Sequence, residues 1–466
     1  MSNIGSKSDP LRVAVIGSGP AGFYTFSNLL KHSDVHVELD MIDRVPTPFG
    51  LVRAGVAPDH QKYKTVTRVY DKSAQQPNFR FYGAVEYGTH LHLDDLKSHY
   101  HQVVFATGAQ TDRELGIPGE HLPGSHAATD FIGWYNGHPD YSNRQFDLSQ
   151  ESVAIIGLGN VAIDIARLLC KTEDELKQTD MADYAIEALA NSGVKRVYIL
   201  GRRGPAQAAF SSPEIKEVGE LVDANIQVRP EELELDDHSQ KEREERRDRR
   251  VEKNLEILNS FADQGSDAEK GKTLSIRFLV SPTEIVADES GCVSELRLVR
   301  NKPVLNDWGG IGAQATDVIE ALDVGLVFRS VGYQGVSLAE IPFDDNRSII
   351  RNEKGRVISD DGEALTGLYC CGWIKRGPTG VIGTNKTDAQ ETVSCMMVDL
   401  QAGKILQPQQ TGVGAIEELI SSRQASYVSY RDWQVIDQKE LDRGIKATRP
   451  RIKFTSVDDM LAELDR

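Results

Sequence analysis

The chain has 466 residues, of which 39% are hydrophobic and 26% charged, with a formal net charge of -17. This is the length and composition of an ordinary globular protein of two or three domains. The negative charge argues against nucleic-acid binding, which depends on neutralising phosphates, and against broad adhesion to anionic membranes. Residues 1–10 have the composition of neither a secretion signal nor a transit peptide, and no apolar run could span a bilayer, so we expect a cytoplasmic protein.

The first predicted elements, over residues 11–43, are a strand, a glycine-rich turn, a helix and a second strand. The turn, Gly17-Ser18-Gly19-Pro20-Ala21-Gly22, has the G-x-G-x-x-G spacing. Its first glycine permits a tight turn, the second lets the backbone approach a pyrophosphate, and the third lets helix and strand pack closely. Asp43 ends the next strand, where a carboxylate binds ribose hydroxyls and disfavours a 2′-phosphate. The pattern predicts an FAD or NAD site rather than an NADP site.

A similar pattern is predicted over residues 152–203, after a short apolar strand at 101–108. Its turn, Gly157-Leu158-Gly159-Asn160-Val161-Ala162, has alanine at the third glycine position, which is an accepted variant. The next strand leads to Arg202 and Arg203 instead of an acid, and arginine binds phosphate through forked, charge-assisted hydrogen bonds. The spacing to Arg202 is about twice the usual one, so the polar stretch 171–192 is predicted to be an inserted helical segment. We therefore predict an NADP(H) site.

The later segments are less specific. Residues 229–272, with the run KEREERRDRR, are predicted to form a solvated helix with ion pairs. Strands are expected at 274–280, 293–299 and 324–331, followed by a Gly-rich segment at 367–385 and a tail that is partly helical and partly extended. The five cysteines are expected to be buried, inert thiols, because none forms a Cys-x-x-Cys pair or a zinc set; they are Cys170, Cys292, Cys370, Cys371 and Cys395. No metal site is expected.

Taken together, these patterns resemble the adrenodoxin reductase family, and within it the bacterial ferredoxin–NADP reductases. The similar motifs are VAVIGSGPAGFY at 13–24, PFGLVRAGVAPDH at 48–60, GLGNVAIDIAR at 157–167, GRRGPAQAAFSSPEIKE at 201–217 and CGWIKRGPTGVIGTNK at 371–386. The resemblance implies an α/β fold with two Rossmann-like dinucleotide-binding domains. The FAD domain would be discontinuous, formed by residues 1–108 and 330–466 including the C-terminal tail, with the NADP domain, residues 109–329, inserted between them.

The resemblance also implies site residues. FAD would be bound by residues of the first turn and by later segments: Gly17, Gly19, Ala21, Gly22, Asp43, Leu51, Val85, Trp373, Gly380, Val381 and Ile382. NADP(H) would be bound by Gly157, Leu158, Gly159, Asn160, Val161, Arg202, Arg203, Glu214 and Gly380. His60 and Asp164 match positions linked to hydride and proton handling, and we expect Glu214 to act with them. Two alternatives stay open: His60 as a structural hydrogen-bond partner, and Asp164 as a charge that serves its helix dipole.

The predicted function is that of an FAD-dependent ferredoxin–NADP(+) reductase, of the EC 1.18.1 class. Hydride would pass from NADPH to the flavin, and single electrons would leave to a ferredoxin-type iron–sulfur protein. A disulfide reductase would need a redox cysteine pair, which the sequence lacks. The alternative is an NADPH-dependent flavoprotein reductase or monooxygenase that acts on a small organic acceptor. Because ferredoxins are acidic, we expect a local basic face; its candidates are Arg53, Lys216, Lys375, Arg376 and the run 243–250.

Overall fold

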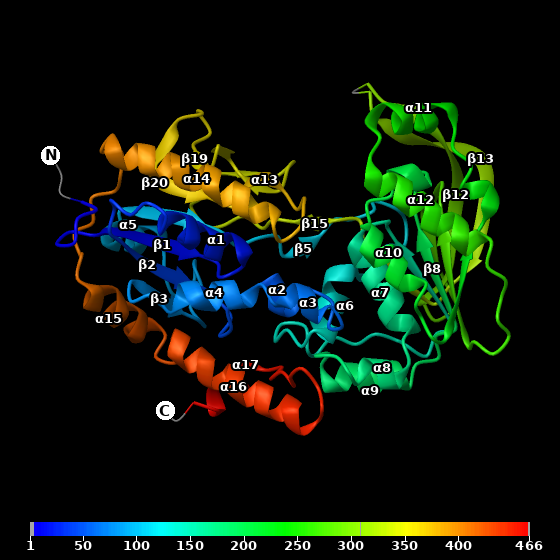
Figure 1. Ribbon diagram of the computed structural model, residues 1–466, viewed down its shortest axis with the longest axis horizontal. Helices are drawn as coiled ribbons and strands as arrows, with labels where there is room; N and C mark the ends of the chain where they lie inside the picture. The colour runs from blue at the N-terminus through cyan, green and yellow to red at the C-terminus, as the bar shows by residue number, and fades with distance from the viewer. Residues whose placement is uncertain (1–3, 308, 465–466) are drawn as a thin grey trace. The chain divides into compact units, whose positions relative to one another are not determined.

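Two compact units make up the part of the chain that the computed structural model describes, residues 4–307 and 309–464 (Figure 1). The first unit comprises residues 1–111, 136–139 and 333–466, and the second comprises residues 112–135 and 140–332. The second unit is therefore inserted into the first, as the sequence predicts. The exact domain limits predicted above, at residues 1–108, 109–329 and 330–466, stay a prediction.

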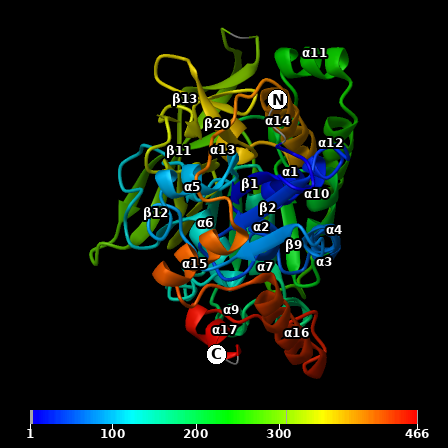
Figure 2. The same cartoon turned by 90° about the vertical axis from the view of Figure 1, so that its left-hand side faces the viewer.

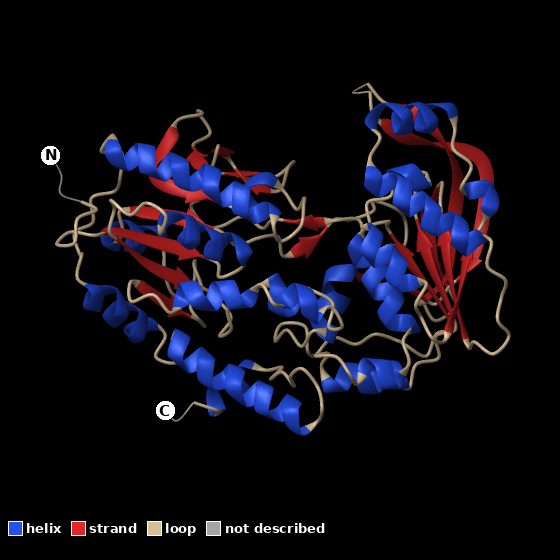
Figure 3. Ribbon diagram, viewed as in Figure 1, coloured by secondary structure: helices blue, strands red, loops and turns tan. Residues whose placement is uncertain are grey.

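The first unit is built around a seven-stranded sheet (Figure 3). In order across the sheet its strands are β18 (Asn352–Glu353), β19 (Arg356–Ile358), β20 (Ala364–Cys370), β4 (Gln102–Phe105), β1 (Leu11–Ile16), β2 (Val37–Ile42) and β3 (Phe79–Tyr82). The five strands from β20 to β3 pair in parallel, while β19 and β18 add an antiparallel edge. The carboxyl ends of the parallel strands therefore meet at one edge, which is where ligands bind in this class of fold.

Successive side chains of β1 pack on opposite faces of this sheet, as expected for a strand. Val13 belongs to a buried hydrophobic cluster that includes residues of α1 (Pro20–Leu29) and α14 (Thr384–Gln401). Ala14 belongs to a second cluster, which includes residues of α5 (Leu93–His99). Because both faces are covered, the strand is apolar at almost every position instead of alternating with polar residues.

The second unit contains a six-stranded parallel sheet and a smaller antiparallel one. The parallel sheet has the order β6 (Ser125–Ala127), β14 (Leu326–Arg329), β7 (Ser152–Ile156), β8 (Arg196–Leu200), β10 (Lys272–Arg277) and β9 (Ala224–Val228). The antiparallel sheet consists of β11 (Val280–Ala287), β12 (Val293–Leu305) and β13 (Ile311–Asp323). Helices α7 (Asn160–Cys170) and α10 (Ser212–Val218) pack against each other in this unit.

Both polar segments of the second unit contain helices, as predicted. These helices are α8 (Glu173–Leu176) and α9 (Asp183–Ala190) in the first segment, and α11 (Asp237–Arg246) and α12 (Arg249–Ala262) in the second. Ion pairs join the charges of the KEREERRDRR run and its surroundings, with Arg243 2.7 Å from Glu252 and Arg246 2.8 Å from Glu242. Arg243 and Arg246 are therefore paired with acids, whereas the other arginines of the run stay candidates for a basic docking face.

The C-terminal tail is helical, with α15 (Val413–Arg423), α16 (Tyr430–Lys446) and α17 (Val457–Ala462). These helices are drawn in orange to red in Figures 1 and 2, and Lys439 of α16 contacts Glu463, just beyond α17, at 2.5 Å. Among the described residues of the tail, the extended part that the sequence suggests is limited to a single bridge between Val428 and Gly83. The tail is thus mainly helical, and its buried residues Trp433, Ile436 and Met460 belong to a hydrophobic cluster of the first unit.

Three residues differ from the exposure expected from their type. Cys292 is exposed in the turn between β11 and β12, whereas the other four cysteines are buried. Arg53 and Lys375 are expected on a basic face, but they are only 9% and 6% exposed, because carboxylates of the same unit pair with them. In the described ranges, no helix is both long and apolar enough to cross a membrane.

Candidate cofactor sites

The first glycine turn joins β1 to α1 and has the geometry of a phosphate-binding loop. Gly17 has a φ of +109°, and a Cβ there would lie 2.5 Å from the Ala106 carbonyl oxygen. A Cβ at Gly22 would lie 2.3 Å from the Gly17 oxygen, whereas a Cβ at Gly19 would meet no atom within 4 Å. Gly17 and Gly22 are therefore required by the fold, while the bare backbone at Gly19 leaves room for a ligand. No side chain caps the N-terminus of α1, so its N–H groups can bind an anion.

Asp43 lies directly after β2 and beside the first turn. One of its carboxylate oxygens accepts hydrogen bonds from the Ser18 backbone N–H at 2.8 Å and the Ser18 hydroxyl at 2.6 Å. Its other oxygen accepts one from the Val45 N–H at 3.2 Å. The acid predicted from the strand end is thus fixed at the turn. Val85 is placed near it by a 2.9 Å hydrogen bond from its N–H to the Asp43 carbonyl oxygen.

The Gly-rich segment after β20 lies against the same turn, although it is more than 300 residues away in sequence. Gly372 has a φ of +81°, and a Cβ there would lie 2.6 Å from the Cβ of Ala21. Trp373 begins the short helix α13 (Trp373–Arg376), and its buried Nε1 has no hydrogen-bond partner in the described chain. Gly380, also at a φ of +81°, approaches Thr384 closely, and Val381 is 66% exposed. An orphaned donor and an exposed apolar side chain are consistent with a flavin site.

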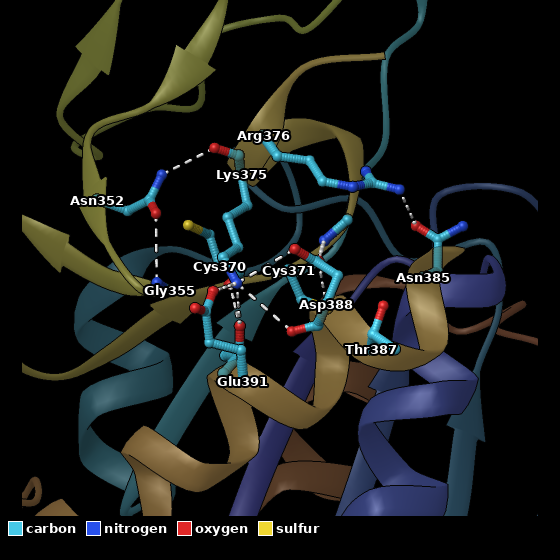
Figure 4. Close-up of polar contacts among 12 residues, drawn as sticks. Asn352, Gly355, Cys370, Cys371, Lys375, Arg376, Asn385, Thr387, Asp388 and Glu391 are labelled. Carbon is cyan, nitrogen blue, oxygen red and sulfur yellow. Dashed lines mark hydrogen bonds and ion pairs between the residues drawn. The ribbon is translucent and has the colours of Figure 1, made fainter. Parts of the chain in front are cut away.

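A buried lysine fixes this segment (Figure 4). The Lys375 ammonium lies 2.8 Å from Glu391, 3.2 Å from Asp388 and 3.1 Å from the Thr392 hydroxyl. The other Asp388 oxygen accepts a hydrogen bond from the Gly372 N–H at 2.5 Å. Burial alone would lower the pKa of Lys375, but the two carboxylates raise it above its ordinary value. The ammonium therefore stays charged and acts as a structural cation, not as a docking residue.

The second glycine turn joins β7 to α7 and repeats the first geometry. Gly157 has a φ of +141°, and a Cβ there would lie 2.1 Å from the Ser330 carbonyl oxygen, whereas a Cβ at Gly159 would meet no atom within 4 Å. No side chain caps the N-terminus of α7. The Asn160 side chain accepts a 2.8 Å hydrogen bond from the Ser211 N–H, and the Leu158 carbonyl accepts one from Ala209 at 2.9 Å. This turn also presents free backbone to an anion.

Arg202 and Arg203 lie just beyond β8. Arg202 is exposed and Arg203 half-buried, and among the described residues neither side chain has a hydrogen-bond or ion-pair partner. Burial and the like charge of Arg202 lower the pKa of Arg203, an effect that Glu242 partly opposes. The backbone beneath them is fixed, since the Asn301 amide donates to the Arg202 carbonyl at 2.9 Å. Two adjacent guanidinium groups on a fixed backbone, neither with an acid in ion-pair contact among the described residues, favour the binding of a phosphate.

Arg167 is a candidate site residue that sequence reasoning missed, because it contacts the predicted residue Asp164. It is 2% exposed, and its guanidinium lies 2.6 Å from Asp164 on the same helix and 3.8 Å from Glu217 on α10. Burial lowers its pKa despite the opposing effects of Glu217 and Glu214. Within the second unit, Arg167 thus pairs with Asp164 and interacts electrostatically with the buried Glu214. The three-residue spacing of Asp164 and Arg167 was a usable signal for their pairing.

His60 belongs to the first unit and directly precedes α3 (Gln61–Lys64). Its ring packs edge-on against Tyr63, with 5.3 Å between the ring centroids. Leu51 of α2 (Leu51–Ala54) follows Gly50, whose Cβ position would be 3.0 Å from the Gly19 Cα. The first turn is thus contacted by Asp43, by Gly50 next to Leu51, and by Gly372 next to Trp373. In the second unit Gly201, next to Arg202, lies against Leu158 of the second turn, while the roles of Glu214 and of Gly380 to Ile382 stay a prediction.

Known proteins match this arrangement. The family model described as pyridine nucleotide-disulphide oxidoreductase matches residues 11–231. The chain is 40% identical to NADPH-ferredoxin reductase FprA of Mycobacterium leprae, over 96% of this chain and 97% of that protein. It is 39% identical to the mitochondrial NADPH:adrenodoxin oxidoreductase of Arabidopsis thaliana, over 98% and 96%. The structure of Mycobacterium tuberculosis FprA in complex with NADPH superposes with a TM-score of 0.90 at 40% identity, covering 97% of this chain and 99% of that one. The predicted fold class is confirmed.

Proposed function

Because the chain belongs to the family of NADPH-ferredoxin reductases that includes FprA and NADPH:adrenodoxin oxidoreductase, we infer that it is an FAD-dependent ferredoxin–NADP(+) reductase. Its cofactors are FAD and NADP(H), as predicted. The observation that carries this conclusion is the difference between its two glycine turns. The first has a carboxylate, Asp43, fixed beside it, and the second is followed by two adjacent arginines, Arg202 and Arg203. One chain thus carries two different dinucleotide sites: the first disfavours a 2′-phosphate, and the second favours one.

We propose that the first turn binds FAD. The backbone at Gly19 would contact the pyrophosphate and Asp43 the ribose, while Trp373 and the turn around Gly380 would border the flavin; the remaining residues are Gly17, Ala21, Gly22, Leu51, Val85, Val381 and Ile382. When bound, FAD takes a hydride from NADPH and releases the electrons singly, which is chemistry that the side chains alone do not supply. The protein supplies binding, orientation and charge.

The purified protein should therefore contain FAD and no FMN. FMN lacks the pyrophosphate that an uncapped helix N-terminus and bare glycine backbone bind. Denaturing the protein and separating the released flavin by chromatography checks this expectation. Release of FMN would be incompatible with the assignment of the first turn.

The second turn is proposed to hold NADP(H). The pyrophosphate would contact Gly157 to Val161, and Arg202 with Arg203 would bind the 2′-phosphate, while Glu214 would lie toward the nicotinamide, with Gly380. Asp164 and Glu214 would act together with the positive charge of Arg167, which pairs with Asp164 and interacts electrostatically with Glu214. His60 of the first unit would act on the same hydride transfer. None of these residues is proposed as a covalent nucleophile. Their role would be to orient the nicotinamide and to hold protons.

Asp164→Asn should slow flavin reduction by NADPH by about tenfold or more, since removing a carboxylate from a buried guanidinium disturbs a shared network. His60→Asn should act in the same direction. The rate of flavin bleaching in an anaerobic stopped-flow instrument measures both effects, with bound FAD quantified in the same samples. Asp174→Asn, on exposed α8, is the matched control and should change nothing. Unchanged bleaching in both site variants would remove these residues from the proposed site.

The proposed electron acceptor is a ferredoxin-type iron–sulfur protein. Of the basic residues suggested by the sequence, Arg53 and Lys375 are buried, and Arg243 is paired with Glu252. Lys216 is exposed, although Glu220 lies 3.3 Å away. Arg53 and Lys375 are therefore removed from the predicted basic face, while Lys216, Arg376 and the other arginines of the run 243–250 stay candidates for it. The cytoplasmic location likewise stays a prediction.

The function is tested by measuring NADPH oxidation separately with ferredoxin, with a disulfide and with oxygen alone. Ferredoxin should support by far the fastest turnover. Because the Debye length falls from about 10 Å at 0.1 M salt to about 3 Å at 1 M, turnover with an acidic ferredoxin should fall with salt more than turnover with a neutral quinone. A disulfide that turns over faster than every ferredoxin tested would contradict the proposal.

A further inference from the structure

Helix α16, in the C-terminal tail, carries a buried carboxylate, Glu440, whose bidentate partner is Arg53, 387 residues earlier in the chain. Glu440 is 0% exposed. Its two oxygens accept hydrogen bonds from the two terminal nitrogens of Arg53, at 2.6 and 2.8 Å, in a bidentate pair. Arg451 lies 3.0 Å from one oxygen, and the Phe454 N–H donates to the other at 2.9 Å. Every acceptor position of this carboxylate faces a donor, so its orientation is fixed.

The same tail holds Arg53 from two further directions. The guanidinium lies over the Trp433 ring of α16, 5.1 Å from its centroid. The Lys453 ammonium donates to the Arg53 carbonyl oxygen at 3.2 Å and to the Asn136 carbonyl oxygen at 3.1 Å. Both the side chain and the backbone of Arg53 are therefore fixed by residues between 433 and 453.

Arg53 belongs to α2, and the two residues that directly precede α2 contact the first glycine turn. The Phe49 N–H donates to the Ser18 carbonyl oxygen at 2.9 Å, and Phe49 also packs edge-on against Trp433, with 5.9 Å between centroids. At Gly50 a Cβ would lie 3.0 Å from the Gly19 Cα. A continuous set of contacts thus leads from Glu440 through Arg53 and α2 to Gly19, where the turn leaves space for a ligand.

Stability alone is a poor reason for this arrangement. A buried ion pair often adds little to stability compared with apolar residues of the same volume, because both charges must be desolvated. Burial alone would raise the pKa of Glu440, but Arg53 and Arg451 bring it below the ordinary value. The carboxylate is therefore charged in the folded protein, and what a bidentate pair provides beyond an apolar contact is a fixed geometry.

We propose that Glu440 is a positioning residue for FAD: through Arg53 it fixes α2 and the two residues before it against the first glycine turn, so that helix α16 sets the affinity for the cofactor. This inference rests on the proposed binding of FAD at that turn. It gives the C-terminal segment a role in cofactor retention without any direct contact between Glu440 and FAD.

Glu440→Gln tests the proposal, since the amide keeps the shape of the carboxylate and removes its charge. Titration of the apoprotein with FAD should give a Kd at least about tenfold higher than that of the wild type, which corresponds to roughly 1.4 kcal/mol. Glu440→Asp, which keeps the charge on a shorter side chain, should give an intermediate Kd. If Glu440→Gln does not fold, Glu440→Asp and Arg53→Lys provide the same comparison.

Two control variants on the same helix separate positioning from general stability. Lys439→Gln removes the more exposed pair with Glu463, and Gln438→Ala removes an exposed hydrogen bond to Asp442, but both leave Glu440 and its partners Arg53 and Arg451 in place. Both should retain the wild-type Kd for FAD, and binding of 2′,5′-ADP should be unchanged in all variants. A Glu440→Gln protein with a lowered melting temperature and an unchanged Kd for FAD would overturn the proposal. A wild-type apoprotein that bound no FAD would instead overturn the proposed function.

Discussion

Replacing both Arg202 and Arg203 by alanine should lower kcat/KM for NADPH by about 10²-fold or more and leave the value for NADH nearly unchanged. Each charge-assisted hydrogen bond to a phosphate is worth roughly 1.5 to 3 kcal/mol, and about 1.4 kcal/mol corresponds to a tenfold change. NADH has no 2′-phosphate, so it loses no such bond. Because no acid in the described chain is paired with these side chains, their removal leaves no buried carboxylate uncompensated.

Steady-state kinetics with both coenzymes, on the double variant and on each single variant, measures this effect. Arg196→Ala is the matched control, because Arg196 lies at the start of β8 and contacts Glu151 at 3.4 Å. It should alter neither coenzyme's kinetics. Equal losses with NADPH and NADH in the double variant would mean that the two arginines are structural.

Gly159→Ala should leave the protein folded but weaken NADPH binding by about tenfold or more, which corresponds to about 1.4 kcal/mol. Gly159 has an extended backbone that alanine adopts readily, and a Cβ there meets no protein atom within 4 Å. The added methyl group would instead occupy the space at the backbone that a pyrophosphate approaches. FAD content should not change, because the first turn is untouched.

Gly157→Ala is the matched comparison, and its main effect should be on thermal stability instead of on NADPH binding. Its φ of +141° and the 2.1 Å approach to the Ser330 oxygen would make alanine strained, lowering the melting temperature before any effect on binding. Calorimetric titration with NADP+ together with thermal unfolding separates the two cases. A Gly159→Ala protein that bound NADP+ with wild-type affinity would show that no pyrophosphate approaches this turn.

The fold and the two turns could be predicted because their signals are local. Gly17 and Gly157 each end an apolar run, and their φ values of +109° and +141° are ones that favour glycine. Asp43 and Arg202 could be assigned from their places shortly after the next strand. The inserted segment 171–192 did not prevent the assignment of Arg202, because β7 and β8 still pair in parallel on either side of it.

The side-chain networks could not be predicted, because they depend on residues far apart in the chain. Arg53 was expected to be exposed from its charge, yet its partner Glu440 lies 387 residues further along. Lys375 is buried because α14 brings Asp388 and Glu391 to it. Charge predicts exposure only when no tertiary partner is available, and a sequence does not show which pairs the fold will bring together.

The central claim is that electrons pass from NADPH to a ferredoxin through a flavin bound to this chain. The most direct test is an anaerobic stopped-flow experiment that mixes NADPH with the FAD-loaded protein and an excess of ferredoxin from the same cell. Flavin absorbance should be lost first, and two ferredoxins should then be reduced for each NADPH consumed, since a hydride carries two electrons. The Arg202→Ala, Arg203→Ala protein should slow both phases. Loss of flavin absorbance without reduction of any ferredoxin, at low or high ionic strength, would contradict the account.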